Sequence, residues 1–459
     1  MTTLGQWGPT VVVGAGQAGP LLSIHLARQG HDVELFESRP DLRRSDIDAG
    51  RSINLALATR GLVPLTELGL RRRVDAITVP MAGRMVHATD GTTSFQPYGT
   101  GTDDVIHSVS RRDLNAILLD AAEETGRVHI TFDRWCHGVD IERRLLSLGP
   151  YGRPGEATDV PFGTVFGCDG AGSEIRRAVV AANGGSVETD ALDHGYKELE
   201  IPPGPGGGFL LDPGALHIWP RGDFMLIALP NPAGDFTTTL FLPHRGPVDS
   251  FAALGDGIAV ERFFAREFPD VAELIPDLVD QFASHPTGSL ATVRVDGWSV
   301  GDAAVLVGDA AHGIVPFHGQ GMNLAMESCR LLDRELRARP DDVAAAFTAF
   351  ERSRKPAADA IADMAIDNYQ EMRSGVVDPD YLLRRQLALE LERRHPDRVA
   401  ARYGMVMFTT MPYDEVQRRN EAQQAVFSEL IADASSLDDV DFERAANLVE
   451  ALGPLPDWI

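Results

Sequence analysis

A glycine-rich turn near the start of the chain has the residue types and spacing of a dinucleotide-binding site. Gly14, Gly16 and Gly19 form the pattern Gly-x-Gly-x-x-Gly after an apolar, β-branched run. In such a turn the first glycine permits a sharp bend, the second lets the backbone approach a diphosphate, and the third lets a helix pack on a strand. Glu37 ends the next apolar run, where an acid can accept hydrogen bonds from ribose hydroxyls. We therefore predict dinucleotide binding, without yet separating FAD from NAD.

Two later aspartates extend this prediction. Asp169 lies in Gly-Cys-Asp-Gly-Ala-Gly-Ser-x-x-Arg and Asp309 in Gly-Asp-Ala-Ala-His, each after an apolar run. An aspartate at such a place can accept hydrogen bonds from ribitol or ribose hydroxyls, while small neighbours let a cofactor come close. Each could instead be a helix N-cap, which is the commoner role of an aspartate there. Together with the glycine turn, the two motifs favour a long, extended cofactor such as FAD.

The elements that must position these residues begin with a strand–helix–strand unit. Residues 9–14 predict a strand, residues 17–29 a helix closed by Gly30, and residues 32–37 a second strand. Such a unit within about thirty residues predicts parallel strands. Residues 194–243 alternate in polarity and are interrupted by glycine and proline, which predicts an antiparallel sheet.

The remaining pattern completes the predicted architecture. A buried strand returns at residues 303–308, a helix follows from about Met322, and the sequence beyond residue 340 is mostly helical. The predicted fold class is α/β, with a Rossmann-type FAD-binding domain, an inserted antiparallel-sheet substrate domain and a C-terminal helical segment. The corresponding division is residues 1–190 and 291–370 for the FAD-binding domain, 191–290 for the substrate domain and 371–459 for the helical segment.

Composition and charge exclude several other kinds of protein. Of 459 residues, 44% are hydrophobic and 24% charged, which is typical of a folded globular protein. The formal net charge of −25 disfavours binding to nucleic acid or to anionic lipid. Three cysteines lie far apart without a histidine cluster, so we expect neither a disulfide framework nor a metal site. The N-terminus lacks signal-peptide features, and no apolar run approaches the roughly 18 residues of a membrane span, so we expect a cytoplasmic protein.

Longer motifs resemble one family of enzymes. The glycine turn and the Asp169 and Asp309 motifs occur in the order found in single-component FAD-dependent aromatic hydroxylases. From about residue 9 to about residue 428 the chain resembles the kynurenine 3-monooxygenase family in its soluble bacterial form. The motifs that carry this resemblance are Arg51-Ser-Ile-Asn-Leu-Ala-Leu57, Ser108-Val-Ser-Arg111-x-x-Leu114-Asn115, His217-Ile-Trp-Pro-Arg221, Met225-Leu-Ile-Ala-Leu-Pro-Asn231, Pro316-Phe-His-Gly-Gln-Gly-Met-Asn323 and Tyr403-Gly-Met-Val-Met-Phe408.

The resemblance implies an NADPH- and O2-dependent FAD monooxygenase that hydroxylates L-kynurenine at ring carbon 3 to give 3-hydroxykynurenine. In this family, flavin reduced by NADPH captures oxygen as a C4a-hydroperoxide, which delivers oxygen to the carbon ortho to the aniline amine. The amine already activates that carbon, so the protein has to orient the ring and exclude water rather than supply a base. Three alternatives stay open: the same chemistry on a ring-substituted kynurenine or an anthranilate-like amino acid, a flavin redox sensor without hydroxylase activity, and a flavin-dependent dehydrogenase.

The resemblance also implies which residues contact the substrate. Arg84 and Tyr98 are expected to bind the substrate carboxylate, and Asn368 and Tyr403 to close the pocket around the amino-acid head. His318 is expected to form a wall of the oxygen-transfer site rather than to act as a base. The ring pocket is expected to contain Leu216, Met225, Ile227, Phe241, Pro316 and Phe317. From periodicity alone, filling a core is the commoner role of the alternate residues of these strands.

For the cofactor, the resemblance implies contacts beyond the glycine turn. Arg111 matches a flavin-contacting arginine on a helix, and Arg39 follows Glu37 near the adenosine end. Asp169 is expected to contact both flavin and NADPH, and Asp309 the ribityl chain. Backbone amides at the start of a helix are expected to stabilise negative charge at the flavin N1–C2 edge, and they belong to Gly321, Met322, Asn323 and Leu324. The sequence is compatible with a homodimer but sets no oligomeric state.

Overall fold

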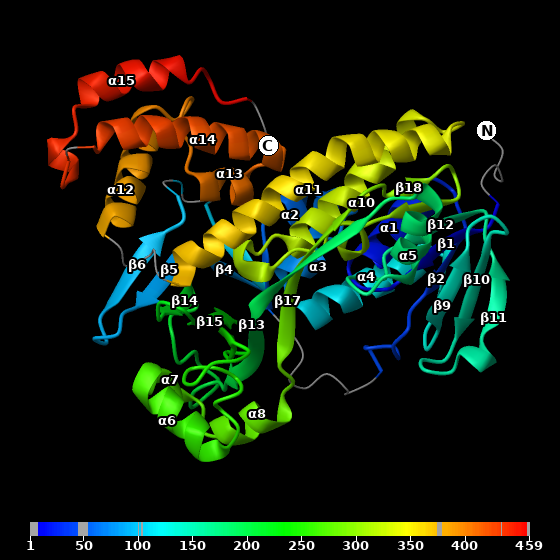
Figure 1. The fold of residues 1–459 in the computed structure, drawn as a ribbon, viewed down its shortest axis with the longest axis horizontal. Helices are drawn as coiled ribbons and strands as arrows, with labels where there is room; N and C mark the ends of the chain where they lie inside the picture. Colours follow the sequence, from blue (N-terminus) through cyan, green and yellow to red (C-terminus); the bar gives the residue numbers. More distant parts are fainter. Residues whose placement is uncertain are drawn as a thin grey trace. The chain divides into compact units, whose positions relative to one another are not determined.

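The chain folds into two compact units, each assembled from separate stretches of sequence (Figure 1). The computed structural model describes residues 8–44, 54–99, 101, 104–373, 379–432 and 434–456. Unit 1 comprises residues 1–77, 110–191 and 291–362, and unit 2 comprises residues 78–109, 192–290 and 363–459. Residues 78–109 and 363–370, which the sequence division assigned to the FAD-binding domain, therefore lie in unit 2. Arg51 to Ile53, which open one of the motifs, lie outside the described residues.

Unit 1 is organised around a six-stranded, mainly parallel sheet. Its strands lie in the order β18 (Ser299–Val300), β19 (Ala304–Leu306), β12 (Thr164–Gly167), β1 (Thr10–Val13), β2 (Val33–Phe36) and β8 (Val128–Thr131). Neighbouring strands are parallel except for β18 with β19. Helix α1 (Ala18–Arg28) joins β1 to β2, so the predicted strand–helix–strand unit and the α/β fold class are confirmed.

Helices pack around this sheet and against one another. Helix α1 contacts α4 (Arg111–Glu124) and α10 (Gly321–Ala338), and α10 also contacts α2 (Thr59–Glu67). A separate antiparallel sheet consists of β9 (Trp135–Asp140), β10 (Leu145–Gly149) and β11 (Thr158–Pro161). The other elements that lie in or begin in unit 1 are β3 (Asn54–Leu57), α3 (Arg71–Asp75), η1 (Pro154–Glu156), α5 (Glu174–Asn183), α9 (Asp309–His312), η2 (Pro316–His318) and α11 (Val343–Arg373).

Unit 2 contains the predicted antiparallel sheet. Its strands lie in the order β13 (Val187–Ile201), β16 (Phe236–Pro243), β15 (Met225–Pro230), β14 (Ala215–Pro220), β5 (Gly83–His87) and β6 (Thr93–Pro97). All these pairs are antiparallel except β5 with β14, which is parallel. Strands β4 (Thr78–Met81) and β7 (Ile106–Ser110) form a further antiparallel pair, and β17 (Gly288–Val295) begins in this unit.

One face of the unit 2 sheet carries a hydrophobic core. Helices α6 (Gly257–Glu267), α7 (Pro269–Leu274) and α8 (Leu278–Ser284) supply its other half. The buried residues from the sheet include Trp219, Leu226 and Leu240. Because side chains alternate along a strand, the residues between them face the other side of the sheet.

The C-terminal part of unit 2 is helical, as predicted. It contains α12 (Pro379–Arg394), α13 (Arg402–Phe408), α14 (Tyr413–Leu430), η4 (Leu437–Asp439) and α15 (Phe442–Ala451). Leu387, Leu391, Phe427 and Val449 belong to a separate small core between these helices. No helix in the described part of the chain is long and apolar enough to cross a membrane. The same residues contain no group of three or more histidine, cysteine or acidic side chains arranged to hold a metal ion.

Candidate flavin and substrate sites

The glycine turn has the geometry that its spacing predicts. Gly14 has a φ of +100°, and a Cβ there would lie 2.3 Å from the carbonyl oxygen of Cys168. A Cβ on Gly19 would lie 1.9 Å from the carbonyl oxygen of Gly14. A Cβ on Gly16, by contrast, would meet no atom within 4 Å. Two of the glycines are therefore needed for packing, and the third leaves open space beside the start of α1, where a helix N-terminus attracts phosphate.

Glu37 joins the turn to the end of β2. Its Oε2 accepts a hydrogen bond from the amide of Ala15 at 2.7 Å, and its Oε1 accepts from the amide and Nε of Arg39 at 2.9 and 3.0 Å. Burial raises the pKa of this carboxyl, but Arg39 and the two amides outweigh burial and leave the pKa lowered. Glu37 is therefore ionised at neutral pH. Its carboxylate already accepts hydrogen bonds that hold the turn, and a ribose hydroxyl would be a further donor.

A cleft of about 200 Å³ opens at this turn. Its lining includes the predicted residues Gly14, Gly16, Glu37, Arg39, Arg111 and Asp169. Sequence reasoning missed Arg134, Trp135 and Cys136, which also line it. A further missed residue is Asn115 on α4, whose amide nitrogen donates to the carbonyl of Ala15 at 3.0 Å and supports the turn from behind. Open space at Gly16, the carboxylates of Glu37 and Asp169 and three arginines suit the diphosphate and ribose of FAD.

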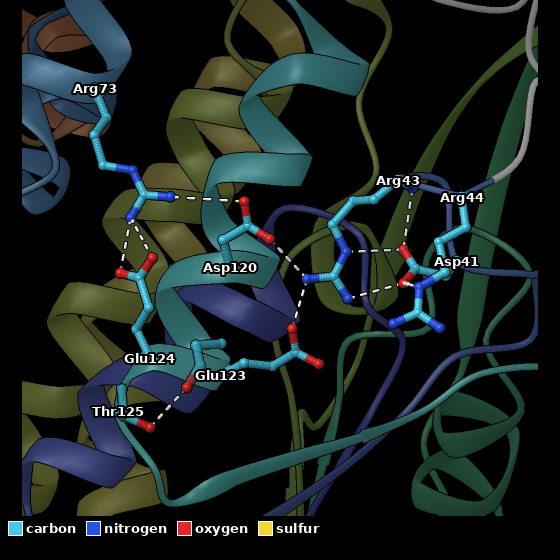
Figure 2. Close-up of polar contacts among 9 residues, drawn as sticks. Asp41, Arg43, Arg44, Arg73, Asp120, Glu123, Glu124 and Thr125 are labelled. Atoms are coloured by element: carbon cyan, nitrogen blue, oxygen red, sulfur yellow. Dashed lines mark hydrogen bonds and ion pairs between the residues drawn. The ribbon is translucent and has the colours of Figure 1, made fainter.

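A network of ion pairs anchors the segment after Arg39 to α4 (Figure 2). Arg43 contacts Asp41 at 2.9 Å, Asp120 at 2.7 Å and Glu123 at 2.6 Å. Its pKa is raised by the hydrogen bond to Asp41, although burial opposes this. The network links the wall of the cleft at Glu37 and Arg39 to the helix that begins at Arg111.

The two predicted aspartates have different environments. Asp169 accepts hydrogen bonds from the hydroxyl of Ser173 and from the amide of Glu174 (2.8 Å), so it caps α5 while also lining the cleft. Burial raises its pKa, against these hydrogen bonds. Asp309 begins α9 with its side chain accessible to solvent, yet the surrounding protein raises its pKa against the charge of Arg111. The carboxylate of Asp309 can therefore accept hydrogen bonds from a ribityl chain.

The start of α10 corrects one detail of the prediction. The amide of Leu324 already donates to the carbonyl of Gln320 at 2.7 Å, so it belongs to the helix and does not serve an anion. The amides of Gly321, Met322 and Asn323 precede the first intrahelical hydrogen bond. The Asn323 side chain accepts from the amide of Ala58 at 2.9 Å and thereby ties this turn to the start of α2. Three amides, not four, are available to a flavin edge.

The loop before α10 contains the other predicted residues of unit 1. Pro316, Phe317 and His318 form the single turn η2, which ends at Gly319 with a φ of +65°. Phe317 and His318 are buried. This turn precedes the three amides directly in sequence, so both belong to one short segment.

In unit 2 the predicted ring-pocket residues share one face of the sheet. Met225 pairs with Phe241, and Leu216 pairs with Arg84 on the neighbouring parallel strand. Ile227 lies two residues from Met225 and therefore on the same face. All of these side chains lie opposite the α6–α8 core, because the core takes the residues between them. The alternation that the sequence showed thus marks a face that this core does not use.

Arg84 lies on that face in contact with two tyrosines. Arg84 and Tyr98 are each only 3% exposed. The Arg84 guanidinium carbon lies 4.7 Å from the ring centroid of Tyr403 and 5.9 Å from that of Tyr98. The two rings stack with centroids 4.8 Å apart. Three of the four residues predicted for the amino-acid head are therefore brought together from β5, the end of β6 and α13.

The protonation states of this cluster suit the binding of an anion. Burial raises the pKa of both Tyr98 and Tyr403, so the phenols are neutral and can donate. The Tyr98 hydroxyl is close to Tyr403 and Arg84 but has no partner in hydrogen-bond geometry among the described residues. Burial opposes the charge on Arg84, yet the surrounding groups leave its pKa raised. A buried cation and a buried hydroxyl donor therefore lie together.

Glu371 is the residue that sequence reasoning missed at this cluster. Its Oε1 lies 3.5 Å from Nη1 of Arg84 and accepts from the hydroxyl of Tyr381 at 2.6 Å. Its Oε2 accepts from Arg402 at 3.0 Å. Asn368 lies one turn earlier on α11, is buried, and donates to the sulfur of Met372 at 3.2 Å. The only signal for Glu371 was its helical spacing of three residues from Asn368, which places both on one side of α11.

The chain is similar to known proteins over most of its length. A family model described as FAD binding domain matches residues 8–195 and 276–365. The kynurenine 3-monooxygenase of Myxococcus xanthus (strain DK1622) is 47% identical over 440 residues, covering 96% of this chain and 94% of that protein. That of Stenotrophomonas maltophilia (strain K279a) is 46% identical, with 97% of both chains covered.

Solved structures share the fold at low sequence identity. A tetrameric 2-methyl-3-hydroxypyridine-5-carboxylic acid oxygenase matches with a TM-score of 0.64 and 19% identity, covering 83% of this chain and 96% of that chain. Pseudomonas aeruginosa PqsL in complex with 2-aminobenzoylacetate matches with a TM-score of 0.64 and 18% identity, covering 80% and 97%. Since relatives with more than 45% identity span nearly its whole length, the chain belongs to the kynurenine 3-monooxygenase family of FAD-dependent hydroxylases.

Proposed function

We propose that this protein is an NADPH- and O2-dependent FAD monooxygenase that hydroxylates L-kynurenine at ring carbon 3. The observation that carries the proposal is the buried Arg84, in contact with Tyr98 and Tyr403, on the same sheet face as an apolar row of side chains. An amino acid with an aromatic ring has one anionic end and one apolar end. This face offers a matching place for each.

The amino-acid head is held by charge and hydrogen bonds. We assign the carboxylate to the guanidinium of Arg84 and the hydroxyl of Tyr98, with Tyr403 packing over the arginine. The α-ammonium group is assigned to Glu371, which Arg402 and Tyr381 keep in place. The guanidinium of Arg84 and the carboxylate of Glu371, 3.5 Å apart, match the two opposite charges of a zwitterion.

The ring lies on the apolar row. Leu216, Met225, Ile227 and Phe241 present no donor or acceptor, so they hold the ring by contact and exclude water. FAD, when bound at the unit 1 site and reduced by NADPH, supplies the electrons and the place of oxygen activation. Gly321, Met322 and Asn323 would hold its pyrimidine edge with their amides, and Asp309 its ribityl chain. Pro316, Phe317 and His318 would form a wall beside the flavin ring, with His318 as a packing residue.

Other features bear on the alternatives. All three cysteines are free and buried, and burial raises the pKa of each thiol, that of Cys136 to about 12. Such thiols are poor redox sensors, which disfavours a sensor based on cysteine chemistry. Free thiols also suit the reducing cytoplasm, where we place the protein. Small molecules, not nucleic acid or membrane, are the proposed partners, and homodimer formation stays a prediction.

The test is product analysis with the purified, FAD-loaded protein. It is incubated with NADPH, air and L-kynurenine, and the product is examined by mass spectrometry. A gain of one oxygen, with NADPH consumption stimulated by kynurenine, is the expected result. NADPH consumption that gives only hydrogen peroxide would redirect the proposal to ring-substituted kynurenines. NADPH consumption indifferent to any aromatic amino acid would refute it.

A further inference from the structure

A buried arginine on α11 holds the first turns of α10. Arg354 is 2% exposed. Its Nη2 donates to the backbone carbonyl of Leu324 at 3.0 Å, and its Nε donates to Oγ of Ser328 at 2.9 Å. Nη2 also lies 2.7 Å from Oε2 of Glu327. One guanidinium thus contacts three groups of the short stretch 324–328, which follows directly on the amides at the start of α10.

The same part of α10 is also bonded to α2. The other carboxylate oxygen of Glu327 lies 3.2 Å from Nη1 of Arg60, which is fully buried near the start of α2. Asn323 lies four residues before Glu327, hence on the same side of α10, and accepts from the amide of Ala58 at 2.9 Å. Glu327 therefore bridges two buried arginines, one from α2 and one from α11.

Ser328 connects the arginine of α11 to α9, the short helix that Asp309 begins. Nε2 of His312 lies 3.1 Å from Oγ of Ser328, the same oxygen that accepts from Arg354. His312 is 3% exposed, and burial lowers its pKa to about 3, with the charge of Arg354 adding to this effect, so its ring is neutral at pH 7. Side chains of α9, α10 and α11 therefore meet at one buried hydroxyl.

Both helices joined in this way carry groups that the proposed function assigns to the flavin. Asp309, assigned to the ribityl chain, is the first residue of α9. The amides of Gly321, Met322 and Asn323, assigned to the pyrimidine edge, begin α10. A single flavin can contact both only if the two helices keep a fixed separation. Stability alone does not account for this ion network, because the cost of desolvating buried charges offsets most of their attraction.

We propose that Arg354 is a positioning residue of the flavin site, which fixes the start of α10 relative to Asp309 and thereby favours reduced FAD over oxidised FAD. Reduction places negative charge at the N1–C2 edge, where amides at a helix start stabilise it. This stabilisation depends on the distance and direction of the amides, so a displaced α10 loses affinity mainly for the reduced form. The inference rests on the flavin contacts assigned in the proposed function.

The test is the midpoint potential of bound FAD in Arg354→Lys. Lysine keeps the positive charge but lacks the planar fork that reaches three acceptors in fixed directions, so a changed potential cannot come from a lost charge. We expect reduced FAD to lose roughly tenfold more affinity than oxidised FAD, which lowers the potential of a two-electron couple by about 30 mV. The FAD-loaded protein is reduced slowly beside a reference dye, without substrate. Arg352→Lys, at an exposed position of the same helix, is the matched control and should keep the wild-type potential.

Ser328→Ala is a second variant that removes only the shared hydroxyl. Alanine suits a helix interior, so this variant should fold, and its potential should fall in the same direction by a smaller amount. An unchanged potential in Arg354→Lys would overturn the proposal, as would an equal fall in Arg352→Lys. Should Arg354→Lys fail to fold, an unchanged potential in Ser328→Ala would overturn it instead. If wild-type protein does not hydroxylate kynurenine, the proposed function fails, while the potentials still decide the role of Arg354.

Discussion

Replacing Arg84 by methionine should separate substrate binding from every other property of the enzyme. Methionine keeps much of the apolar volume of the arginine stem but removes its charge and its donors. Two charge-assisted hydrogen bonds to a carboxylate, at about 1.5–3 kcal/mol each and not fully additive, suggest a loss of about 3–4 kcal/mol. Since about 1.4 kcal/mol corresponds to a factor of ten, KM for L-kynurenine should rise roughly 100-fold to 1,000-fold.

The structure also indicates why the variant should stay folded. Glu371 loses a contact of 3.5 Å but keeps Arg402 at 3.0 Å and Tyr381 at 2.6 Å, so its carboxylate is not left without a partner. The Tyr98 and Tyr403 rings keep each other as neighbours. We therefore expect full FAD content and a melting temperature within a few degrees of wild type. Arg393→Met, which removes an arginine exposed on α12, is the matched control and should leave KM unchanged.

A double comparison makes the assay decisive. Wild type and Arg84→Met are each assayed with L-kynurenine and with its decarboxylated analogue, and kcat/KM is compared in all four combinations. If Arg84 binds the carboxylate, removing that group should harm the wild type strongly and the variant hardly at all, because the interaction is already absent. Equal penalties in the two proteins, or a KM for kynurenine within twofold of wild type, would refute the carboxylate assignment.

Three further perturbations address unit 1. Gly16→Ala should fold normally, because its Cβ meets no atom within 4 Å, but it should bind FAD at least tenfold more weakly in equilibrium titration. Gly14→Ala should fail to fold, because its Cβ would lie 2.3 Å from a carbonyl oxygen. Normal FAD affinity in Gly16→Ala would contradict the diphosphate site. The lowered pKa of Glu37 means that its ion pair stabilises the fold above the pKa of the unfolded chain and that this contribution is lost as pH falls through the folded pKa. Glu37→Gln should therefore reduce the free energy of unfolding by about 1–2 kcal/mol at pH 7 in urea titrations, with the difference shrinking below about pH 4; a constant difference across pH would exclude the ionic contribution. Arg43→Met should lower the melting temperature by a few degrees, because it removes the ion pairs of Arg43 with three carboxylates. In calorimetry, 1 M salt should reduce this difference. An unchanged melting temperature would mean that the network is only a solvated surface feature.

Much of the FAD site could be read from the sequence because its signals are local. The bend at Gly14, the helix after it and the strand that ends at Glu37 lie within one short stretch, where turn chemistry and hydrophobic periodicity act directly. The same holds for the alternation of Met225 and Ile227, which predicted a shared face before the neighbouring strands were known. What periodicity could not decide was whether that face filled a core. The α6–α8 core occupies the opposite face, and only the fold shows this.

Details within the predicted motifs also needed the structure. Asp169 accepts a hydrogen bond from the first amide of α5 and also lines the cleft, so its structural role is confirmed while its contact with a cofactor stays a prediction. Leu324 was expected to offer an amide, but the exact start of a helix decides which amides remain unpaired, and Gln320 takes that one.

For the substrate cluster too, the sequence indicated the residues but not their contacts. The motif resemblance nominated Arg84, Tyr98 and Tyr403, and their side chains are of types that can bind a carboxylate. That these side chains meet depends on contacts across hundreds of residues, in which no local pattern specifies a partner. The parallel pairing of β5 with β14 and the placing of Glu371 beside Arg84 both arise from such contacts. Residue types and local spacing set the chemistry that this protein can support, and tertiary packing decides where its charged groups meet.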